Sequence, residues 1–500
     1  MKMNQIFAPV VTRSSALFLA TFVFFAGCTT VAEIRTHHDA SDEVIEVDAD
    51  NPSRDCSASS RTSPARAHSI EDYKKYWAGF VEFDDEGWLY EPHGQPTQMQ
   101  VVQSRLKKEL NDPQYANTDF LVVAFVHGWH HNANDTDCNV HEFRAMLKVA
   151  NDRYAAAMSA SPKMHPRRIV GVYAGWRGES ININGINVTT VLDRRNAAER
   201  VAKGDVRELF AQLRKLQIGE SQKSDLAGGP MRADRMRTVV IGHSFGGLIA
   251  FHGMSPAVLN ELTLTKPEDG DQGCRPTVLR PPAVQMQNGE RFAKSETEAA
   301  EKEKTAPVFP DMLILINPAF EATRFESLHA LMRPSGNCEY PEDRPKVVVV
   351  TADNDRATGP IFHASRKVLT LLEAYPQERD TGDDVSRERD ANTHAIGFTQ
   401  RYQTHRLCVI GEGPEKRAVA ALTPPDSPEW KLDKYAPVWV VRAPPRIVDG
   451  HNGFFFAERE AGSSKQEPYL LDWLVSLHLL GPGPKSPVMT LDNGCPPPTL

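Results

Sequence analysis

Continuous apolar runs alternate with helical patterns along most of the chain. The runs expected to be buried strands cover residues 120–129, 167–176, 238–241, 311–320, 346–355 and 436–445. Amphipathic or apolar helical patterns cover 96–110, 141–158, 194–216 and 469–480, and 76–90 predicts two short strands around a turn. Strands that are apolar along their whole length and separated by helices predict an α/β fold with a mainly parallel sheet covered on both faces.

Two stretches interrupt this alternation. Residues 256–310 are rich in Pro, Glu and Lys, and residues 376–434 are rich in charge and Pro. Long irregular stretches in a compact domain are lids or surface excursions. The pattern predicts one domain over 71–482 that carries both insertions, followed by a C-terminal tail over 483–500.

The N-terminus has the layout of an export signal. Lys2 and Arg13 precede the apolar stretch 16–26, which is short for a membrane span. Phe25-Ala26-Gly27-Cys28 resembles the lipobox of bacterial lipoproteins, which implies cleavage after residue 27 and acylation of Cys28. A plain cleaved signal peptide is the alternative. Residues 28–70 are polar and acidic and predict a disordered tether. We therefore expect an exported, lipid-anchored envelope protein facing the periplasm.

Composition narrows the possible partners. The 500 residues are 40% hydrophobic and carry a formal charge of −8 with no dense Lys/Arg block, which argues against nucleic acid. Membrane attachment would therefore rely on acyl chains, and the sequence leaves the oligomeric state open. Disulfides are permitted in an exported chain, and no CxxC pair is present. Besides Cys28, the cysteines are Cys56, Cys138, Cys274, Cys338, Cys408 and Cys495.

A possible nucleophile lies between a strand and a helix. The β-branched run 238–241 leads into Gly242-His243-Ser244-Phe245-Gly246, and a helical pattern follows. A nucleophile elbow requires such a strand-to-helix turn, with glycines beside a strained serine whose hydroxyl stands above the sheet. The alternative is a glycine-rich turn that contains an exposed serine.

In this context the chain resembles the α/β-hydrolase family, and more closely a group of bacterial exported esterase/lipase-like proteins. The resemblance covers about 73–480 and rests on "FVHGW", "GWRG", "GHSFGG", "NPAFEA" and "DGHNG". It implies an oxyanion hole formed by the backbone N–H groups of Phe245 and Trp129, with no cofactor. Gly128 would allow close approach of the substrate, and His127 would orient the loop.

The order of catalytic residues in this fold places an acid and then a histidine after the serine. "VVVVTADND" offers Asp353 and Asp355, of which we favour Asp355, a few residues past the expected strand end. His451 follows the last strand in a glycine-flanked loop, and His405 in the second insertion is its rival. Imidazole titrates near neutrality and so suits the transfer of the serine proton.

Histidines and aspartates also gather in the loop "HGWHHNANDTD". His127, His130, His131, Asp135 and Asp137 could be read as metal ligands. Metal ligands come from spaced positions on rigid elements, whereas adjacent histidines tend to point apart. We therefore expect no metal site.

The resulting hypothesis is a serine hydrolase of carboxylic esters that acts on a small ester or lipid through an acyl-enzyme on Ser244. An amidase, peptidase or acyltransferase would use the same residues. A catalytically inactive envelope protein that serves as a binding scaffold is the alternative from a different class.

Overall fold

The computed structural model describes residues 32–47, 67–160, 165–178, 191–226, 235–267, 274–276, 284–287, 290–293, 309–332, 345–373, 382–411, 416–422, 437–455, 467–477 and 489–490. The chain divides into Met1–Glu33 and Ile34–Leu500, and the account below concerns the second unit. The predicted signal segment and Cys28 lie outside the described residues. Within the described ranges, no helix has the length and apolar composition needed to cross a bilayer.

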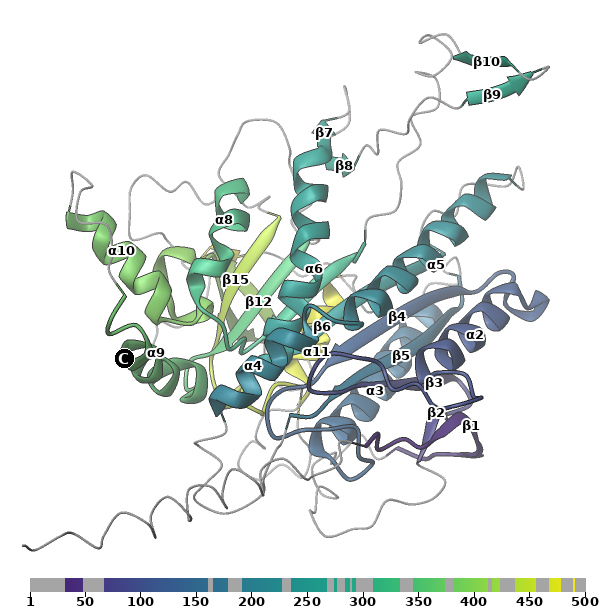
Figure 1. Ribbon diagram of the computed structural model, residues 1–500, viewed down its shortest axis with the longest axis horizontal. Helices are drawn as coiled ribbons and strands as arrows, with labels where there is room; N and C mark the ends of the chain where they lie inside the picture. Colours follow the sequence, from purple (N-terminus) through teal and green to yellow (C-terminus); the bar gives the residue numbers. More distant parts are fainter. Residues whose placement is uncertain are drawn as a thin grey trace, which may run out of the picture. The chain divides into compact units, whose positions relative to one another are not determined.

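A twelve-stranded sheet forms the centre of this unit (Figure 1). Every neighbouring pair from β3 to β13 is parallel. The pairs β2–β3 and β13–β14 are antiparallel, and the outermost pairs β1–β2 and β14–β16 are parallel again. In spatial order the strands are β1 (His37–Val44), β2 (His68–Asp72), β3 (Tyr76–Phe83), β5 (Arg167–Trp176), β4 (Asp119–Val126), β6 (Met236–His243), β11 (Met312–Ile316), β12 (Val347–Ala352), β15 (Val438–Ala443), β13 (His405–Ile410), β14 (Arg417–Leu422) and β16 (Met489–Thr490). The predicted α/β fold, with a mainly parallel sheet, is confirmed.

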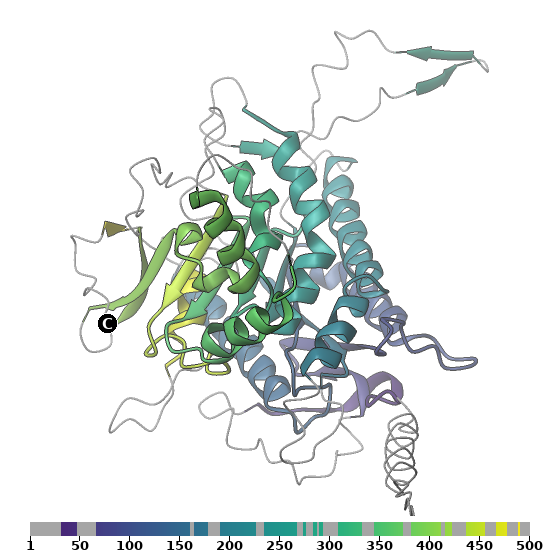
Figure 2. The same cartoon turned by 60° about the vertical axis from the view of Figure 1, so that its left-hand side comes forward.

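Helices cover both faces of the sheet, and Figure 2 shows the arrangement from a second direction. Alternate residues of a strand contribute to two separate cores on the two faces of the sheet. In β4, Val122, Ala124 and Val126 face one core, and Leu121 and Phe125 face the other. The first core is closed by α2 (Gln98–Asn111), α4 (Val191–Val201), α5 (Val206–Leu226), α6 (Phe245–Leu264) and α8 (Glu326–Met332), and the second by α3 (Cys138–Ala160) and α11 (Tyr469–Ser476).

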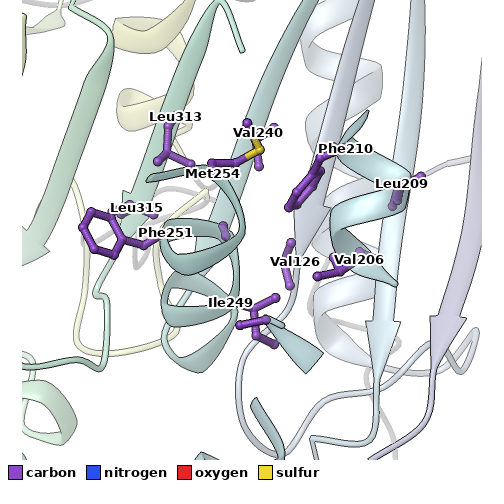
Figure 3. Packing of buried hydrophobic residues seen from close by; sticks show 14 of the residues in the cluster. Val126, Val206, Leu209, Phe210, Val240, Ile249, Phe251, Met254, Leu313 and Leu315 are labelled. Carbon is purple, nitrogen blue, oxygen red and sulfur yellow. The ribbon is translucent and has the colours of Figure 1, made fainter. Parts of the chain in front are cut away.

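The helix after the nucleophile turn is anchored by this packing. Figure 3 shows Ile249, Phe251 and Met254 of α6 among side chains of the sheet such as Val240 and Leu315. All five are almost fully buried. Burial of an aliphatic or aromatic side chain is worth about 1.5–3 kcal/mol, so α6 and the turn before it are firmly positioned.

The tether predicted over 28–70 is wrong for the residues that form β1, β2 and the segment before β1. The backbone N–H groups of Ile34 and Arg35 donate to the Glu82 carboxylate, and Arg35 Nη1 lies 2.6 Å from Glu71 Oε1 in full burial. Burial acts to raise the pKa of Glu71, but the charges of Arg144 and Arg35 hold it well below its usual range. Polar composition predicted disorder because buried ion pairs cannot be read from composition.

The single helix predicted over 194–216 is two helices, α4 and α5. A turn from the end of β3 docks at their junction: Leu89 N donates to Asp205 Oδ2, and Asp205 N donates to Gly87 O, both at 2.8 Å. The second strand predicted within 76–90 is likewise replaced by one bridge between Phe83 and Leu89. The turn that contains Gly87 and Leu89 explains both differences from the prediction. It bonds to the junction of α4 and α5 instead of forming a second strand.

The two predicted insertions are more regular than expected. α6 continues through Pro256 to Leu264, and short paired strands follow it at β7 (Thr265–Pro267), β8 (Cys274–Pro276), β9 (Val284–Gln287) and β10 (Glu290–Ala293). The stretch 376–434 supplies α10 (Gly382–Thr393) and also β13 and β14, which extend the main sheet. Cys408 in β13 is disulfide-bonded.

Candidate active site

The predicted nucleophile lies in a strained turn between β6 and α6. Ser244 has φ 54°, in the left-handed region that costs a side-chain-bearing residue energy. Its N–H donates to Ile316 O at 3.0 Å, and its carbonyl accepts from Ala319 N at 3.1 Å. Gly246 allows the turn to approach β4, because a Cβ there would lie 2.1 Å from Val126 O. The turn is therefore held by both neighbouring strands.

The structure brings Ser244, His451 and Asp355 into one hydrogen-bonded chain. Ser244 Oγ lies 2.9 Å from His451 Nε2, and His451 Nδ1 lies 2.9 Å from Asp355 Oδ2. His451 is on the tight turn after β15, closed by backbone bonds between Asp449 and Gly453. The three side chains come from the ends of three parallel strands, where sites in such sheets form.

Asp355 is almost fully buried, and several donors surround its carboxylate. Ala357 N donates to Oδ1 at 2.8 Å, and the Thr358 hydroxyl donates to Oδ2. Burial acts to raise the pKa of Asp355, but the hydrogen bond and charge of His451 and the bonds from Thr358 outweigh it and lower the pKa. Asp355 is therefore ionised opposite the Nδ1 atom of His451.

Both rival residues lie elsewhere. Asp353 accepts from Arg442 Nε at 3.1 Å and pairs with the Arg406 guanidinium. His405 is fully buried in β13 against the Trp439 ring, and burial lowers its pKa to about 3. Its Nδ1 lies 2.8 Å from Thr404 Oγ1, so the imidazole is bonded to the residue directly before its strand.

The loop 127–131, predicted to form the oxyanion hole, lies against the nucleophile. A Cβ built on Gly128 would be 2.9 Å from Ser244 Cβ, and the Trp129 ring lies 6.5 Å from the Phe245 ring. Phe245 is the first residue of α6, so its N–H has no carbonyl partner within the helix. The Phe245 N–H therefore lies directly after Ser244 without a helical partner, and the oxyanion role of Phe245 and Trp129 stays a prediction.

The "GWRG" stretch supports this loop, a role that the sequence did not reveal. Trp176 N donates to His127 Nε2, and Trp176 Nε1 donates to His127 O, both at 2.9 Å. Gly178 exchanges backbone bonds with His130 and His131, and a Cβ on it would lie 2.6 Å from Gly128 O. Burial lowers the pKa of His127 to about 4, so its neutral ring accepts at Nε2 and donates from Nδ1 to Gly128 O.

The other polar side chains of this loop bond to one another. His131 Nδ1 lies 3.0 Å from Asp137 Oδ1, and the His130 ring stacks on Trp129 at 3.9 Å. Among the residues that the structure describes, no three His, Cys, Asp or Glu side chains are grouped so that they could hold a metal ion.

Sequence reasoning missed two residues that hold the His451 turn. Asn317 Nδ2 donates to His451 O at 2.8 Å and to Gly450 O at 3.1 Å, while its Oδ1 accepts from Ala352 N. His243 Nε2 donates to the same His451 carbonyl at 2.9 Å. The only sequence signal was their position: Asn317 opens "NPAFEA" after β11, and His243 precedes the serine.

The same "NPAFEA" stretch joins the helices beside the site. Glu321 is buried, pairs with the Arg195 guanidinium of α4 and lies 2.7 Å from Arg324 Nε. It also lies 3.0 Å from Arg366 Nη1 of α9 (Phe362–Leu369). Burial acts to raise the pKa of Glu321, but these arginines outweigh it and lower the pKa. The segment that contacts Ser244 through Ala319 therefore also ties α4 to α9.

No family model matches the chain, and no curated protein matches it. A solved structure of phospholipase PlaB from Legionella pneumophila in complex with thio-NAD is similar to it at 16% identity and a TM-score of 0.19. The match covers 61% of this chain and 49% of the phospholipase, so the chain spans about half the length of that protein. Likeness at this level carries no functional argument. The fold class of the chain rests on its own sheet order.

Proposed function

We propose that the protein is a serine hydrolase of carboxylic esters that acts through an acyl-enzyme on Ser244. The observation that carries the proposal is the hydrogen-bonded chain from Ser244 Oγ through His451 to Asp355, placed at a strained strand-to-helix turn. A hydroxyl is a weak nucleophile until a positioned base accepts its proton, and this geometry supplies the base and its orienting carboxylate.

The reaction uses each of these groups in turn. His451 Nε2 takes the Ser244 proton as Oγ bonds to the ester carbonyl carbon, and the N–H groups of Phe245 and Trp129 bind the resulting oxyanion. Donors of this kind each lower the barrier by about 3 kcal/mol. The intermediate then expels the alcohol, which receives the proton from His451. Water attacks the acyl-enzyme by the same route, releasing the carboxylic acid and restoring Ser244.

Asp355 keeps the imidazole in the tautomer that this cycle requires. Its carboxylate accepts from Nδ1–H, which leaves the Nε2 lone pair directed at Ser244. Asp355 stays ionised throughout because its pKa is lowered. It also stabilises the imidazolium that forms during each attack.

A covalent serine probe tests the proposal. We expect a fluorophosphonate to label the chain and Ser244→Ala to abolish labelling together with hydrolysis of p-nitrophenyl esters. Ser159→Ala is a matched control, because Ser159 is an exposed serine at the end of α3. Labelling that survives Ser244→Ala would remove Ser244 from its role. No labelling of folded protein would favour the inactive scaffold, whereas labelling with amide but not ester turnover would favour an amidase.

We also propose export and lipid anchoring at Cys28, supported by the sequence pattern of residues 1–28. Cells fed a labelled fatty acid should yield labelled protein in the membrane fraction. Cys28→Ser should lose both the label and the membrane association, and retention of either would contradict the anchor.

A further inference from the structure

The segment before β1 places a charged side chain inside the body of the protein. Arg35 is fully buried, and its guanidinium carbon lies 3.7 Å from the centre of the Phe80 ring. Its N–H donates to Glu82 Oε1 at 2.8 Å, and its carbonyl accepts from Gln98 Nε2 at 2.9 Å. The backbone and the side chain of Arg35 are therefore both fixed, so this residue can hold other parts of the structure.

The guanidinium of Arg35 contacts two partners that lie far apart in the sequence. Nη1 lies 2.6 Å from Glu71 Oε1, and Nε donates to Ala133 O at 2.7 Å. Ala133 belongs to residues 127–137, which connect β4 to α3 and are called the β4–α3 loop below. It is almost fully buried, where a carbonyl without a donor is unfavourable. Arg35 Nε therefore ties this loop to the N-terminal segment.

Glu71 connects this contact to a second one in the same loop. Its Oε1 also lies 2.6 Å from Arg144 Nη2, and Arg144 Nη1 donates to Asp135 O at 3.0 Å. One buried carboxylate thus fixes two arginines, and each arginine holds a carbonyl of the β4–α3 loop. Hydrogen bonds between charged partners are short and strong, so residues 133–135 are held firmly from the side of Glu71.

The β4–α3 loop also carries the predicted oxyanion donor. Trp129 lies only four residues before Ala133. Ala133 packs closely against β5, because a Cβ built on Gly175 would lie 3.0 Å from Ala133 Cβ. A loop that lacks the Arg35 bond can therefore move away from β5 but not towards it. Over four residues, such a movement also shifts the Trp129 N–H.

We propose that Arg35 is a positioning residue for catalysis, which holds the β4–α3 loop where the Trp129 N–H meets the oxyanion. This role rests on the proposed function, in which that N–H binds the oxyanion. A misplacement of about 1 Å can cost about 100-fold in rate. Tyr173 Oη still holds Asn132 O at 3.0 Å when Arg35 is changed, so the displacement is partial and the expected loss of kcat is about tenfold to 30-fold.

Two substitutions in the full chain separate the two contacts of Arg35. Arg35→Lys puts a methylene group in the position of Nε and keeps a positive charge beside Glu71, so it loses the loop bond. Arg35→Gln puts an amide nitrogen in the position of Nε and loses the charge, so it can keep the bond to Ala133 O. Arg144 still neutralises Glu71 in both variants. We therefore expect Arg35→Gln to have the lower melting temperature and Arg35→Lys to have the lower kcat.

Kinetics of a soluble p-nitrophenyl ester measure the role at a temperature where each variant is folded by circular dichroism. In Arg35→Lys, kcat should fall by about tenfold to 30-fold and KM should stay within about twofold, because ground-state binding does not use the oxyanion donor. Arg35→Gln should recover kcat to within about threefold of the parent, a change of less than one power of ten. A merely structural role would instead make kcat follow the melting temperature.

A transition-state analogue and hydrogen exchange report the loop in two further ways. Ser244 Oγ adds to the carbonyl of a trifluoromethyl ketone, its proton passes to His451, and the carbonyl oxygen becomes an oxyanion. The Ki of this ketone should rise in Arg35→Lys in proportion to the loss of kcat/KM. Amide exchange in peptides that cover 127–137 should quicken in the same variant, whereas peptides of α5 should keep the parental rate.

Arg168→Lys is the matched control. Arg168 is also buried, lies 3.0 Å from a Glu109 carboxylate oxygen and donates from Nη1 to Lys74 O at 2.8 Å, so its contacts are of the same kind. It lies at the start of β5, whereas Trp176 at the other end of that strand bonds to the β4–α3 loop. Arg168→Lys should lower the melting temperature and leave kcat, the ketone Ki and exchange over 127–137 at their parental values.

Four results would overturn the role of Arg35. They are a parental kcat in Arg35→Lys, a loss of kcat that the ketone Ki does not follow, unchanged exchange over 127–137, or an equal loss of kcat in Arg168→Lys. Loss of kcat in Arg35→Gln with retention in Arg35→Lys would also overturn it. Fluorophosphonate labelling and ester hydrolysis by the parent report the proposed function separately. A parent that does neither would sink both proposals, whereas an active parent beside an equally active Arg35→Lys would sink only the role of Arg35.

Discussion

Replacing Asn317 by aspartate would test whether the turn that carries His451 must be held from below. Asn317 donates from one amide nitrogen to the carbonyls of His451 and Gly450 and accepts from Ala352 N. Asn317→Asp keeps the size, the acceptor and a residue type that tolerates φ 44°. It removes both donated bonds and places a carboxyl opposite two carbonyl oxygens.

The magnitude follows from those two bonds. A buried hydrogen bond contributes about 1 kcal/mol, and leaving its partner unsatisfied raises the cost to about 1–3 kcal/mol, so the pair is worth about 2–6 kcal/mol. His451 O keeps the bond from His243 Nε2, which places the expected loss in the lower part of this range. If that energy positions the imidazole, kcat/KM falls by about 30-fold to 1000-fold, at 1.36 kcal/mol per factor of ten.

The assay is kcat/KM for a soluble p-nitrophenyl ester measured across pH, beside a thermal melt. Only the protonated form of the introduced carboxyl can donate to the His451 carbonyl, so the deficit of Asn317→Asp should deepen as pH rises. Asn354→Asp is the matched control: Asn354 bonds to Gly450 N and Asp449 in the same turn but is exposed and does not contact the His451 carbonyl. It should retain kcat/KM within about threefold, a change of less than 1 kcal/mol.

A variant that melts earlier yet keeps the kcat/KM of the parent at every pH would refute this reasoning. Asn317 would then stabilise the fold without positioning the base. An equal loss in Asn354→Asp would also refute it, because any disturbance of the turn would then suffice.

Three further outcomes are expected. Asp355→Asn should lower kcat/KM by about 10⁴-fold, because the imidazole of His451 would adopt the wrong tautomer. Asp353→Asn should lower the melting temperature and leave fluorophosphonate labelling near that of the parent. The reverse result would exchange the roles of the two aspartates. Gly178→Ala should lower kcat by about 100-fold with little change in the folded fraction by circular dichroism, because its Cβ would lie 2.5 Å from His131 O and displace the oxyanion loop. The free energy of unfolding in urea should fall as pH drops from 6.5 towards 4, because His127 and His405 stay neutral in the fold, with pKa values of about 4 and 3, while the unfolded chain binds protons. His405→Leu should flatten this slope, and an unchanged slope would show that His405 titrates normally.

The sequence predicted those parts of the fold that apolar patterning controls. The runs at 120–129, 167–176 and 311–320 became β4, β5 and β11 because a strand buried on both faces is apolar along its whole length. The turn at Ser244 was recognisable because its glycines are required by close backbone contact, not by composition. Local pattern was sufficient wherever local physics decides the structure.

Long-range polar contacts could not be predicted from the sequence. Asp353 and Asp355 are only two residues apart, and their roles differ because Asp353 bonds to Arg442 on β15 and Arg406 on β13. β13 lies in a charged stretch of the sequence that did not predict a strand. Arg35 belonged to a segment that composition assigned to disorder, yet its partner Glu71 is buried on a neighbouring strand. Such pairs depend on which strands adjoin, and strand order is not written in hydrophobic periodicity.

The last residue of β6, His243, and the residue after it, Ser244, both bond to His451. His243 fastens the backbone of the loop that carries His451, and the next residue along the chain is Ser244. A slide or tilt of this strand therefore carries the Ser244 hydroxyl and the support of the His451 backbone in the same direction. Thermal motion of the sheet can displace Ser244 and His451 together while changing the distance between them little.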